Sequence, residues 1–203
     1  MVTAFGLISD LASKSLAFVH VAGIPVGIDR EAVLTTSRLD LLIPTHKPVV
    51  VLPGLLEFTL VLNPGAVFGV GAGRRWFFVG FTIVALAFAT FIFGLWTRAK
   101  DRWAHVAIGL IAAGGLGNLY DRLRFACVRD FIHPLPGVKL PFGLSWPSGS
   151  NEVWPYVSNV ADLYLIVGIG ILLMINWSKP KHARSKADAS QSAGNDDRPP
   201  ASV

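Results

Sequence analysis

The chain has 203 residues, of which 52% are hydrophobic and only 15% are charged. Soluble globular domains carry about a quarter charged residues, so this balance indicates a membrane protein. The net charge of +5 does not indicate nucleic-acid binding, because no Gly-rich phosphate loop or basic–aromatic module accompanies it. The single cysteine, Cys127, excludes an internal disulfide framework and a multi-cysteine metal site.

Four apolar segments are candidates for membrane-spanning helices, at about 1–22, 76–96, 103–121 and 157–177. The second is the clearest, because it contains no charge and begins and ends with Trp; its length matches the ~20 residues that cross a bilayer. The first contains Asp10 and Lys14, which are four residues apart and can pair on one helix face. It lacks a basic start and an uninterrupted apolar core, so we expect a retained helix and not a cleaved signal peptide.

Segment 23–75 is expected to form a small extracytoplasmic β-rich subdomain. It mixes turn residues with short β-prone runs at Val49–Leu52 and Phe58–Leu62. A second extracytoplasmic loop, 131–156, separates the third and fourth spans. The polar tail 178–203 has no apolar period and is expected to be disordered.

Basic residues near the span ends predict the orientation. The short loop 97–102 carries three of them, and the tail opens with four more, which places both on the cytoplasmic side. Four spans then leave both termini in the cytoplasm. The outer segments also carry basic residues, but long loops count little in this rule.

A cluster of charges follows the third span, and one acid lies near the start of the fourth. In this topology Asp130 emerges at the outer boundary, and Asp162 lies ~7–8 Å along the fourth helix. We expect the two carboxylates to meet. Desolvation and repulsion would then leave one protonated and one ionised, an arrangement that can activate water against an amide. The alternative is that Asp130 pairs with Arg129 or Arg124 and that Asp162 only caps the turn after Asn159.

Five motifs, in this order, closely resemble those of the lipoprotein signal peptidases (type II signal peptidases). They are Asp10-Leu-Ala-Ser-Lys14, Asn63-Pro-Gly-Ala-Val-Phe-Gly69, Gly114-Gly-Leu-Gly-Asn-Leu-Tyr-Asp-Arg122, Val128-Arg-Asp-Phe131 and Asn159-Val-Ala-Asp162. The resemblance covers about residues 7–177. It implies a four-helix aspartic endopeptidase of the inner membrane, which removes the signal peptide from diacylglyceryl-modified prolipoproteins just before the lipidated cysteine.

The resemblance also implies roles for individual residues. The catalytic pair would be Asp130 and Asp162. Polar residues of the substrate cleft would be Asn63, Asn118, Arg122 and Asn159, and structural support would come from Asp10, Lys14 and Asp121. The outer segment would be a strand-built cradle with a mobile flap near the site. No metal or organic cofactor is implied; the partners would be lipid-modified prolipoproteins and membrane lipids, and the enzyme would be a monomer with its active site at the extracytoplasmic face.

The chain departs from the family pattern at several places. Ser158 stands where an aromatic residue usually precedes the Asn. The interval from Asp130 to Asp162 is longer than usual, with an added loop rich in Pro, Gly and Trp. The segment 23–53 looks expanded, and the first span looks clipped. These departures bear on substrate fit and on the flap more than on the chemistry.

Parts of the sequence also suggest other functions. A small transporter or proton-relay protein would use Asp10, Lys14 and Asp162, with its acids spread across the bilayer and not clustered at one face. A non-catalytic relative that only binds lipoprotein precursors would lack one of the two acids, and both are present. A thiol protease would use Cys127 and His133, but Cys127 lies in an apolar run and nothing in the sequence orients the imidazole.

Overall fold

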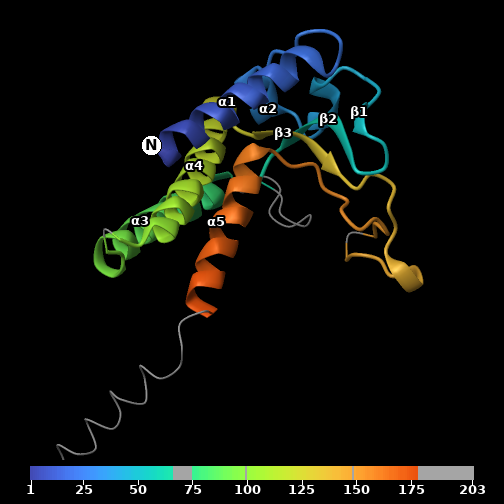
Figure 1. The fold of residues 1–203 in the computed structure, drawn as a ribbon. Coiled ribbons are helices and arrows are strands. Elements are labelled where there is room, and N and C mark those ends of the chain that lie inside the picture. The colour runs from blue at the N-terminus through green and yellow to red at the C-terminus, as the bar shows by residue number, and fades with distance from the viewer. Residues whose placement is uncertain (66–74, 99, 148, 178–203) are drawn as a thin grey trace, which may run out of the picture.

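The structure is a computed structural model that describes residues 1–65, 75–98, 100–147 and 149–177. Its long helices are α1 (Val2–His20), α3 (Arg75–Trp96), α4 (Arg102–Phe125) and α5 (Val160–Trp177). The short elements are α2 (Arg30–Thr35), the 3-10 turns η1 (Leu39–Leu42) and η2 (Pro141–Gly143), and strands β1 (Val49–Leu52), β2 (Leu56–Asn63) and β3 (Val128–Pro134). The strands form an antiparallel sheet in the order β1-β2-β3. Figure 1 shows this sheet at one end of the helices.

Among the described residues, three helices are long and apolar enough to cross a membrane: α1, α3 as far as Leu95, and α5. The fold is therefore mostly helical with a small sheet. Helix α4 is the longest helix but is not one of these three. Its last turns carry Asp121 and two arginines, which lower its apolar character.

Two helix boundaries differ from the predicted spans. Helix α4 continues past residue 121 to Phe125 and ends where Ala126 adopts a left-handed conformation (φ 64°). Helix α5 begins at Val160 and not at 157, because Ser158 instead forms a β-bridge with Ile132. Asp162 therefore lies in the first turn of α5, closer to the helix start than the sequence suggested.

The outer segment contains both predicted strands, since Val49–Leu52 forms β1 and the run at Phe58–Leu62 lies within β2. Helix α2 and turn η1 in this segment were not predicted from the sequence. Strand β3 was not predicted either; it begins at Val128 and continues into the start of the predicted loop 131–156. The expected disordered tail, and residues 66–69 of the Asn63 motif, lie outside the described residues.

A buried apolar cluster attaches the sheet to the helices. It comprises Ala17, Phe18, Val21, Val33, Leu60, Leu62, Ala126, Cys127 and Phe131. Arg30 of α2 reinforces the junction, because its Nη1 donates a hydrogen bond of 2.5 Å to the carbonyl oxygen of Leu123 in the last turn of α4. This packing holds the chain that leaves α4, and with it the start of β3.

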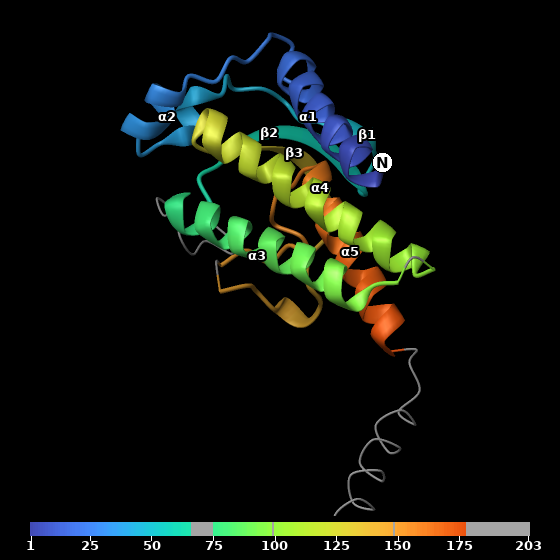
Figure 2. The same cartoon turned by 90° about the vertical axis from the view of Figure 1, so that its left-hand side faces the viewer.

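Helices α4 and α5 approach closely through glycines. A Cβ added at Gly114 would collide with the carbonyl oxygen of Ala161, and one at Gly168 would lie 2.7 Å from the carbonyl oxygen of Ala107. Small residues allow this close approach of helices in membranes. Figure 2 shows α4 lying between α1 and α3, with α5 crossing beside it. The close approach brings the C-terminal half of α4 next to the first turn of α5.

We predict that Gly168→Ala lowers the melting temperature of the purified protein, because the new methyl group overpacks the α4–α5 contact by about 1–3 kcal/mol. Gly170→Ala is the matched control, since nothing lies within 4 Å of a Cβ added there. Thermal unfolding in detergent measures both variants. Equal melting temperatures would contradict the close contact.

Candidate active site

A cavity of about 540 Å³ lies where β2, β3, α4 and α5 meet. Both predicted catalytic acids line it, Asp130 from β3 and Asp162 from α5. Three of the predicted substrate-binding residues also line it: Asn63, Asn118 and Arg122. The fourth, Asn159, is buried immediately behind the two acids. The structure thus brings together side chains from four motifs that are separate in the sequence.

Strand pairing places Asn63 next to Asp130. In the β2–β3 register Val61 lies opposite Asp130 and Asn63 lies opposite Val128, so Asn63 and Asp130 share one face of the sheet. The Asn63 Nδ2 atom donates a hydrogen bond of 3.1 Å to Asp130 Oδ2. Its Oδ1 atom accepts one of 2.9 Å from the N–H of Gly65, which fixes the direction of the amide.

Two further amides connect the acids. Asn159 Nδ2 donates to Asp130 Oδ1 at 2.6 Å and to Asn118 Oδ1 at 3.2 Å. Asn118 Nδ2 in turn donates to Asp162 Oδ1 at 2.8 Å. A continuous chain of hydrogen bonds therefore joins Asp130 to Asp162 through Asn159 and Asn118.

Asp162 is also held by the start of its own helix. Its Oδ2 atom accepts the N–H of Asn159 at 3.2 Å, and its N–H donates to Asn159 Oδ1 at 3.1 Å. This reciprocal pair caps the first turn of α5. The predicted alternative, in which Asp162 caps the turn after Asn159, is therefore also observed, together with the contact to Asn118 and the cavity.

A buried ionic network lies beneath the acids and comprises Asp10, Lys14, Asp121 and Arg129. Lys14 Nζ lies 2.9 Å from Asp10 Oδ2, which confirms the predicted pair, and 3.6 Å from Asp121 Oδ2. Lys14 Nζ also donates to Asn118 Oδ1 at 3.0 Å. Because an ammonium group can only donate, it fixes Asn118 Oδ1 as an acceptor and turns Nδ2 toward the acid on α5.

Arg129 belongs to this network and not to Asp130. Its guanidinium contacts Asp121 at 2.8 Å, and its backbone N–H donates to the same carboxylate at 3.0 Å. The alternative in which Arg129 neutralises Asp130 is therefore wrong. Asp130 instead accepts hydrogen bonds from the uncharged amides of Asn63 and Asn159.

Burial changes the titration of Asp130, whose residue is only 2% exposed. Loss of solvent, followed by the negative charge of Asp162, raises the pKa of the Asp130 carboxyl to about 7, against the lowering effect of its two amide donors. This carboxyl therefore keeps its proton in a large fraction of molecules near neutral pH.

Comparison with known proteins shows to which family the chain belongs. The profile of the signal peptidase (SPase) II family matches residues 2–178. The chain belongs to this family. It is therefore a peptidase of the membrane, with several apolar helices.

Individual relatives agree with this assignment. The lipoprotein signal peptidase of Desulfitobacterium hafniense strain DCB-2 is 34% identical over 128 residues, which are 63% of this chain and 72% of the relative. That of Streptococcus pyogenes serotype M1 is 36% identical over 129 residues, 63% of this chain and 73% of the relative. A solved structure described as a bacterial membrane enzyme has the same fold, with a TM-score of 0.59, 24% identity, and coverage of 88% of this chain and 92% of that one.

Arg122 lies on the cavity wall of this signal peptidase II family member. Its Nη1 donates to the carbonyl oxygen of Asn118 at 3.3 Å, and its Cζ lies 5.5 Å from the ring centroid of Phe78. Its Nε is buried and has no hydrogen-bond partner among the described residues. A buried donor without a partner is costly, so this guanidinium is suited to donate a hydrogen bond to a carbonyl or carboxylate oxygen of a bound molecule.

The wall opposite α4 was missed by the sequence analysis. It consists of Trp154, Pro155, Tyr156, Val157 and Ser158, which precede α5. The missed signal is the aromatic–Pro–aromatic run 154–156, which two residues separate from the Asn159 motif. Trp154 and Tyr156 supply aromatic surface to the cavity near Ser158.

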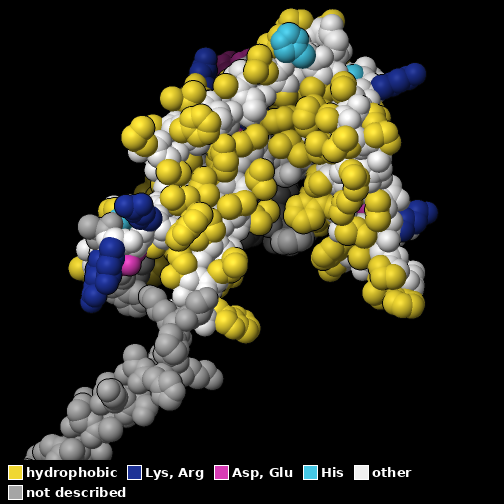
Figure 3. All heavy atoms as spheres, viewed as in Figure 1, with side chains coloured by type: hydrophobic (Ala, Val, Ile, Leu, Met, Phe, Trp, Pro, Cys, Tyr) yellow, Lys and Arg dark blue, Asp and Glu magenta, His cyan; other side chains and the backbone are white. Residues whose placement is uncertain are grey.

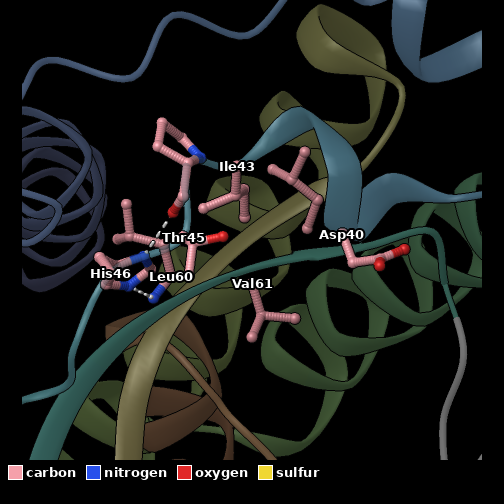
Figure 4. A pocket seen from close by; sticks show the side chains of 8 residues that line it. Asp40, Ile43, Thr45, His46, Leu60 and Val61 are labelled. Atoms are coloured by element: carbon pink, nitrogen blue, oxygen red, sulfur yellow. Dashed lines mark hydrogen bonds between the residues drawn. The ribbon is translucent and has the colours of Figure 1, made fainter.

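A second hollow, of about 320 Å³, lies between η1 and β2 (Figure 4). Asp40 and His46 lie at opposite ends of it. Asp40 forms an ion pair with Arg38 at 2.6 Å, and the ring of His46 accepts the N–H of Leu60 at 3.1 Å. This hollow contains only one acid, so it does not offer the paired carboxylates of the first cavity.

We predict that Asp130→Asn stabilises the protein at high pH. Because the folded-state pKa of Asp130 is raised, its favourable contribution is complete below the ordinary value of 3.8 and is lost as the pH rises through about 7. The variant removes this loss, so its melting temperature should exceed that of the natural protein above pH 7 and match it near pH 4. A variant that is less stable at high pH would contradict the raised pKa.

Proposed function

We propose that this enzyme cleaves the signal peptide from diacylglyceryl-modified prolipoproteins, with Asp130 and Asp162 acting together on one water molecule. The observation that carries this proposal is the pair of carboxylates on one cavity, linked through Asn159 and Asn118. The names of the relatives support the substrate class. The lipid-modified substrate reaches the cavity from the bilayer.

In the proposed reaction Asp162 is the base. It lies in the first turn of α5, where the unpaired N–H groups of the helix favour negative charge, and it accepts two N–H donors. It takes a proton from water as the water oxygen bonds to the scissile carbonyl carbon. Asp130, which keeps its proton in a large fraction of molecules near pH 7, donates it to the carbonyl oxygen. When the C–N bond breaks, the proton held by Asp162 passes to the leaving amine, and one hydroxyl of the intermediate returns its proton to Asp130 as the new carboxyl group forms.

Substrate contacts follow from the walls of the cavity. Asn63 and Arg122 lie beside the acids and would bind backbone groups around the scissile bond, whereas Asn118 and Asn159 orient the acids themselves. Asp10, Lys14 and Asp121 would act by supporting Asn118 and β3. The aromatic wall of Trp154 and Tyr156 would contact apolar parts of the precursor.

We further propose four spans, with α4 as the third. Helix α4 packs against α1, α3 and α5, so it lies within the bundle that the three apolar helices form. The basic loop and tail then lie in the cytoplasm together with both termini. Segment 23–75 and loop 131–156 lie outside, which places the cavity at the extracytoplasmic face of the inner (plasma) membrane. We also propose that the enzyme acts as a monomer, because both acids and the amides that bind them come from the same chain.

The proton-relay alternative is less compatible with this arrangement. Asp10, Lys14, Asp121, Asp130 and Asp162 all belong to one connected cluster at the sheet end of the bundle. Helices α3 and α5 contain no other acid along the rest of their length. A path for protons across the bilayer would need further ionisable groups at other depths.

We predict that Asp130→Asn and Asp162→Asn each lower cleavage of a lipidated precursor in proteoliposomes by at least about a hundredfold, because each removes one proton-transfer group. Asp40→Asn is the matched control, because Asp40 is exposed and lies outside the cavity. The variants should insert into the membrane as the natural protein does. Retained turnover in both cavity variants would defeat the proposal.

We predict that Cys127→Ser remains active. Cys127 is fully buried, and burial raises the pKa of its thiol to about 12, so little reactive thiolate forms. His133, the base of the thiol alternative, instead contacts Glu57 at 2.8 Å. Cleavage of the same precursor checks this, and a folded but inactive variant would revive the thiol mechanism.

A further inference from the structure

Residues 135–157 form an arm between β3 and α5 that is built as a hairpin. The N–H of Leu140 donates to the carbonyl oxygen of Asn151 at 2.7 Å, and the N–H of Val153 donates to that of Val138 at 2.7 Å. Lys139 and Glu152 lie opposite each other in a β-bridge. The arm is therefore an ordered projection whose two limbs support one another.

The arm is tied to the sheet at its base. His133 of β3 lies between two acids, with Nδ1 at 2.8 Å from Glu57 Oε1 on β2 and Nε2 at 3.7 Å from Glu152 Oε2 on the arm. The N–H of Leu135 donates to the carbonyl oxygen of Leu55 at 2.9 Å. These contacts fix the direction in which the arm leaves the sheet.

The tip of the arm exposes large apolar side chains. Phe142 is 97% exposed and Leu144 is 58% exposed, both in or next to η2. Phe142 has a left-handed backbone (φ 59°), which is unfavourable for a bulky residue. The chain therefore holds an aromatic ring away from its own core in a conformation that costs energy, a feature that points to function.

We propose that lipid covers this tip, so that Phe142 and Leu144 lie at the boundary between headgroups and acyl chains of the leaflet next to the cavity. The second limb of the arm, which leads back toward α5, ends at residue 157, two residues before the first turn of that helix. This short connection keeps the arm near the membrane surface. Exposed apolar side chains continue from there along α5, at Leu163 and Ile166. Figure 3 shows apolar side chains over both the arm and the neighbouring helices on this face.

The distribution of charged residues on the arm is compatible with a tip that lies in lipid. The tip segment 140–147 contains no charged residue, and the nearest basic side chain, Lys139, is exposed and able to reach the phosphate level with its long stem. Aromatic residues favour the membrane–water interface. An apolar tip flanked by a basic residue is the composition of an interfacial membrane anchor.

The anchor also has a consequence for substrate cleavage, and this consequence rests on the proposed function. The same returning limb supplies Trp154, Pro155 and Tyr156 to the cavity wall. A tip held in lipid would fix this wall at the depth where a lipidated substrate approaches. The arm would thereby lower the KM for precursors in a bilayer without contributing to the chemical step.

Depth measurement by spin labelling tests the anchor without reference to activity. Phe142→Cys is labelled with a nitroxide in the full-length protein, reconstituted in vesicles of phosphatidylethanolamine and phosphatidylglycerol. Buried Cys127 stays unlabelled, which the unsubstituted protein verifies. Ile166→Cys on the exposed face of α5 is the lipid reference, and exposed Ser37→Cys, in the outer segment, is the aqueous reference.

The expected result is that the label at 142 collides readily with oxygen and poorly with a water-soluble nickel chelate, as at 166 and unlike at 37. A label at 142 as accessible to nickel as at 37 would overturn the proposal. A label shielded from both reagents would also overturn it, because protein and not lipid would then cover the tip.

The kinetic consequence has its own test. Phe142→Ser combined with Leu144→Ser should raise the KM for a lipidated precursor several-fold in vesicles, with kcat retained and little change in detergent micelles. Phe142→Trp, which keeps interfacial affinity, should preserve the KM. An unchanged KM in vesicles would show that the arm has no part in substrate capture, even if the depth measurement places the tip in lipid.

Discussion

The hydrogen bond from Lys14 to Asn118 is the contact on which the site depends. Lys14 is fully buried, and among the described residues it forms ion pairs with Asp10 and Asp121. An ammonium group has no acceptor capacity, so it imposes a direction on the amide of Asn118. That direction is passed on to Asp162 and, through Asn159, to Asp130. A buried ion network is a weak source of stability, but it specifies one arrangement of the groups around it.

The same network explains why charged residues occupy β3. Arg129 and Asp130 are neighbours in the chain, yet their side chains lie on opposite faces of the strand. Arg129 pairs with Asp121, and among the described residues Asp130 accepts hydrogen bonds from the neutral amides of Asn63 and Asn159. The separation of the two charges is what allows burial to raise the pKa of Asp130. Sheet geometry thus creates the chemical difference between the two acids.

The sequence predicted much of this architecture because the apolar spans are long and the motifs are local. The segment 76–96, the runs in β1 and β2, and the Asp10–Lys14 pair are set by composition and helical spacing. The sequence also predicted that Asp130 and Asp162 meet, because both acids lie at a similar depth near the ends of neighbouring predicted spans. The continuation of α4 to Phe125 could not be predicted, because Asp121 is buried there through ion pairs with Lys14 of α1 and Arg129 of β3 that helical spacing does not reveal.

Strand β3 was missed for a related reason. Its first residues read as a cluster of charges after a span, whereas in the fold they are buried against Asn63, Asp121 and Asn159. The aromatic wall of the cavity belongs to the loop before α5, and the local sequence does not show which way this loop runs. Its position depends on the sheet and on the contacts of His133 with two acids. Such long-range placement is set by tertiary packing and not by periodicity.

The most direct test of the account is the pH dependence of kcat/KM for cleavage of a lipidated precursor. If the proton on Asp130 is required, kcat/KM falls as the pH rises above about 7, because the pair then loses the proton that one acid must donate. A kcat/KM that stays constant or continues to rise well above pH 7 would contradict the shared-proton mechanism.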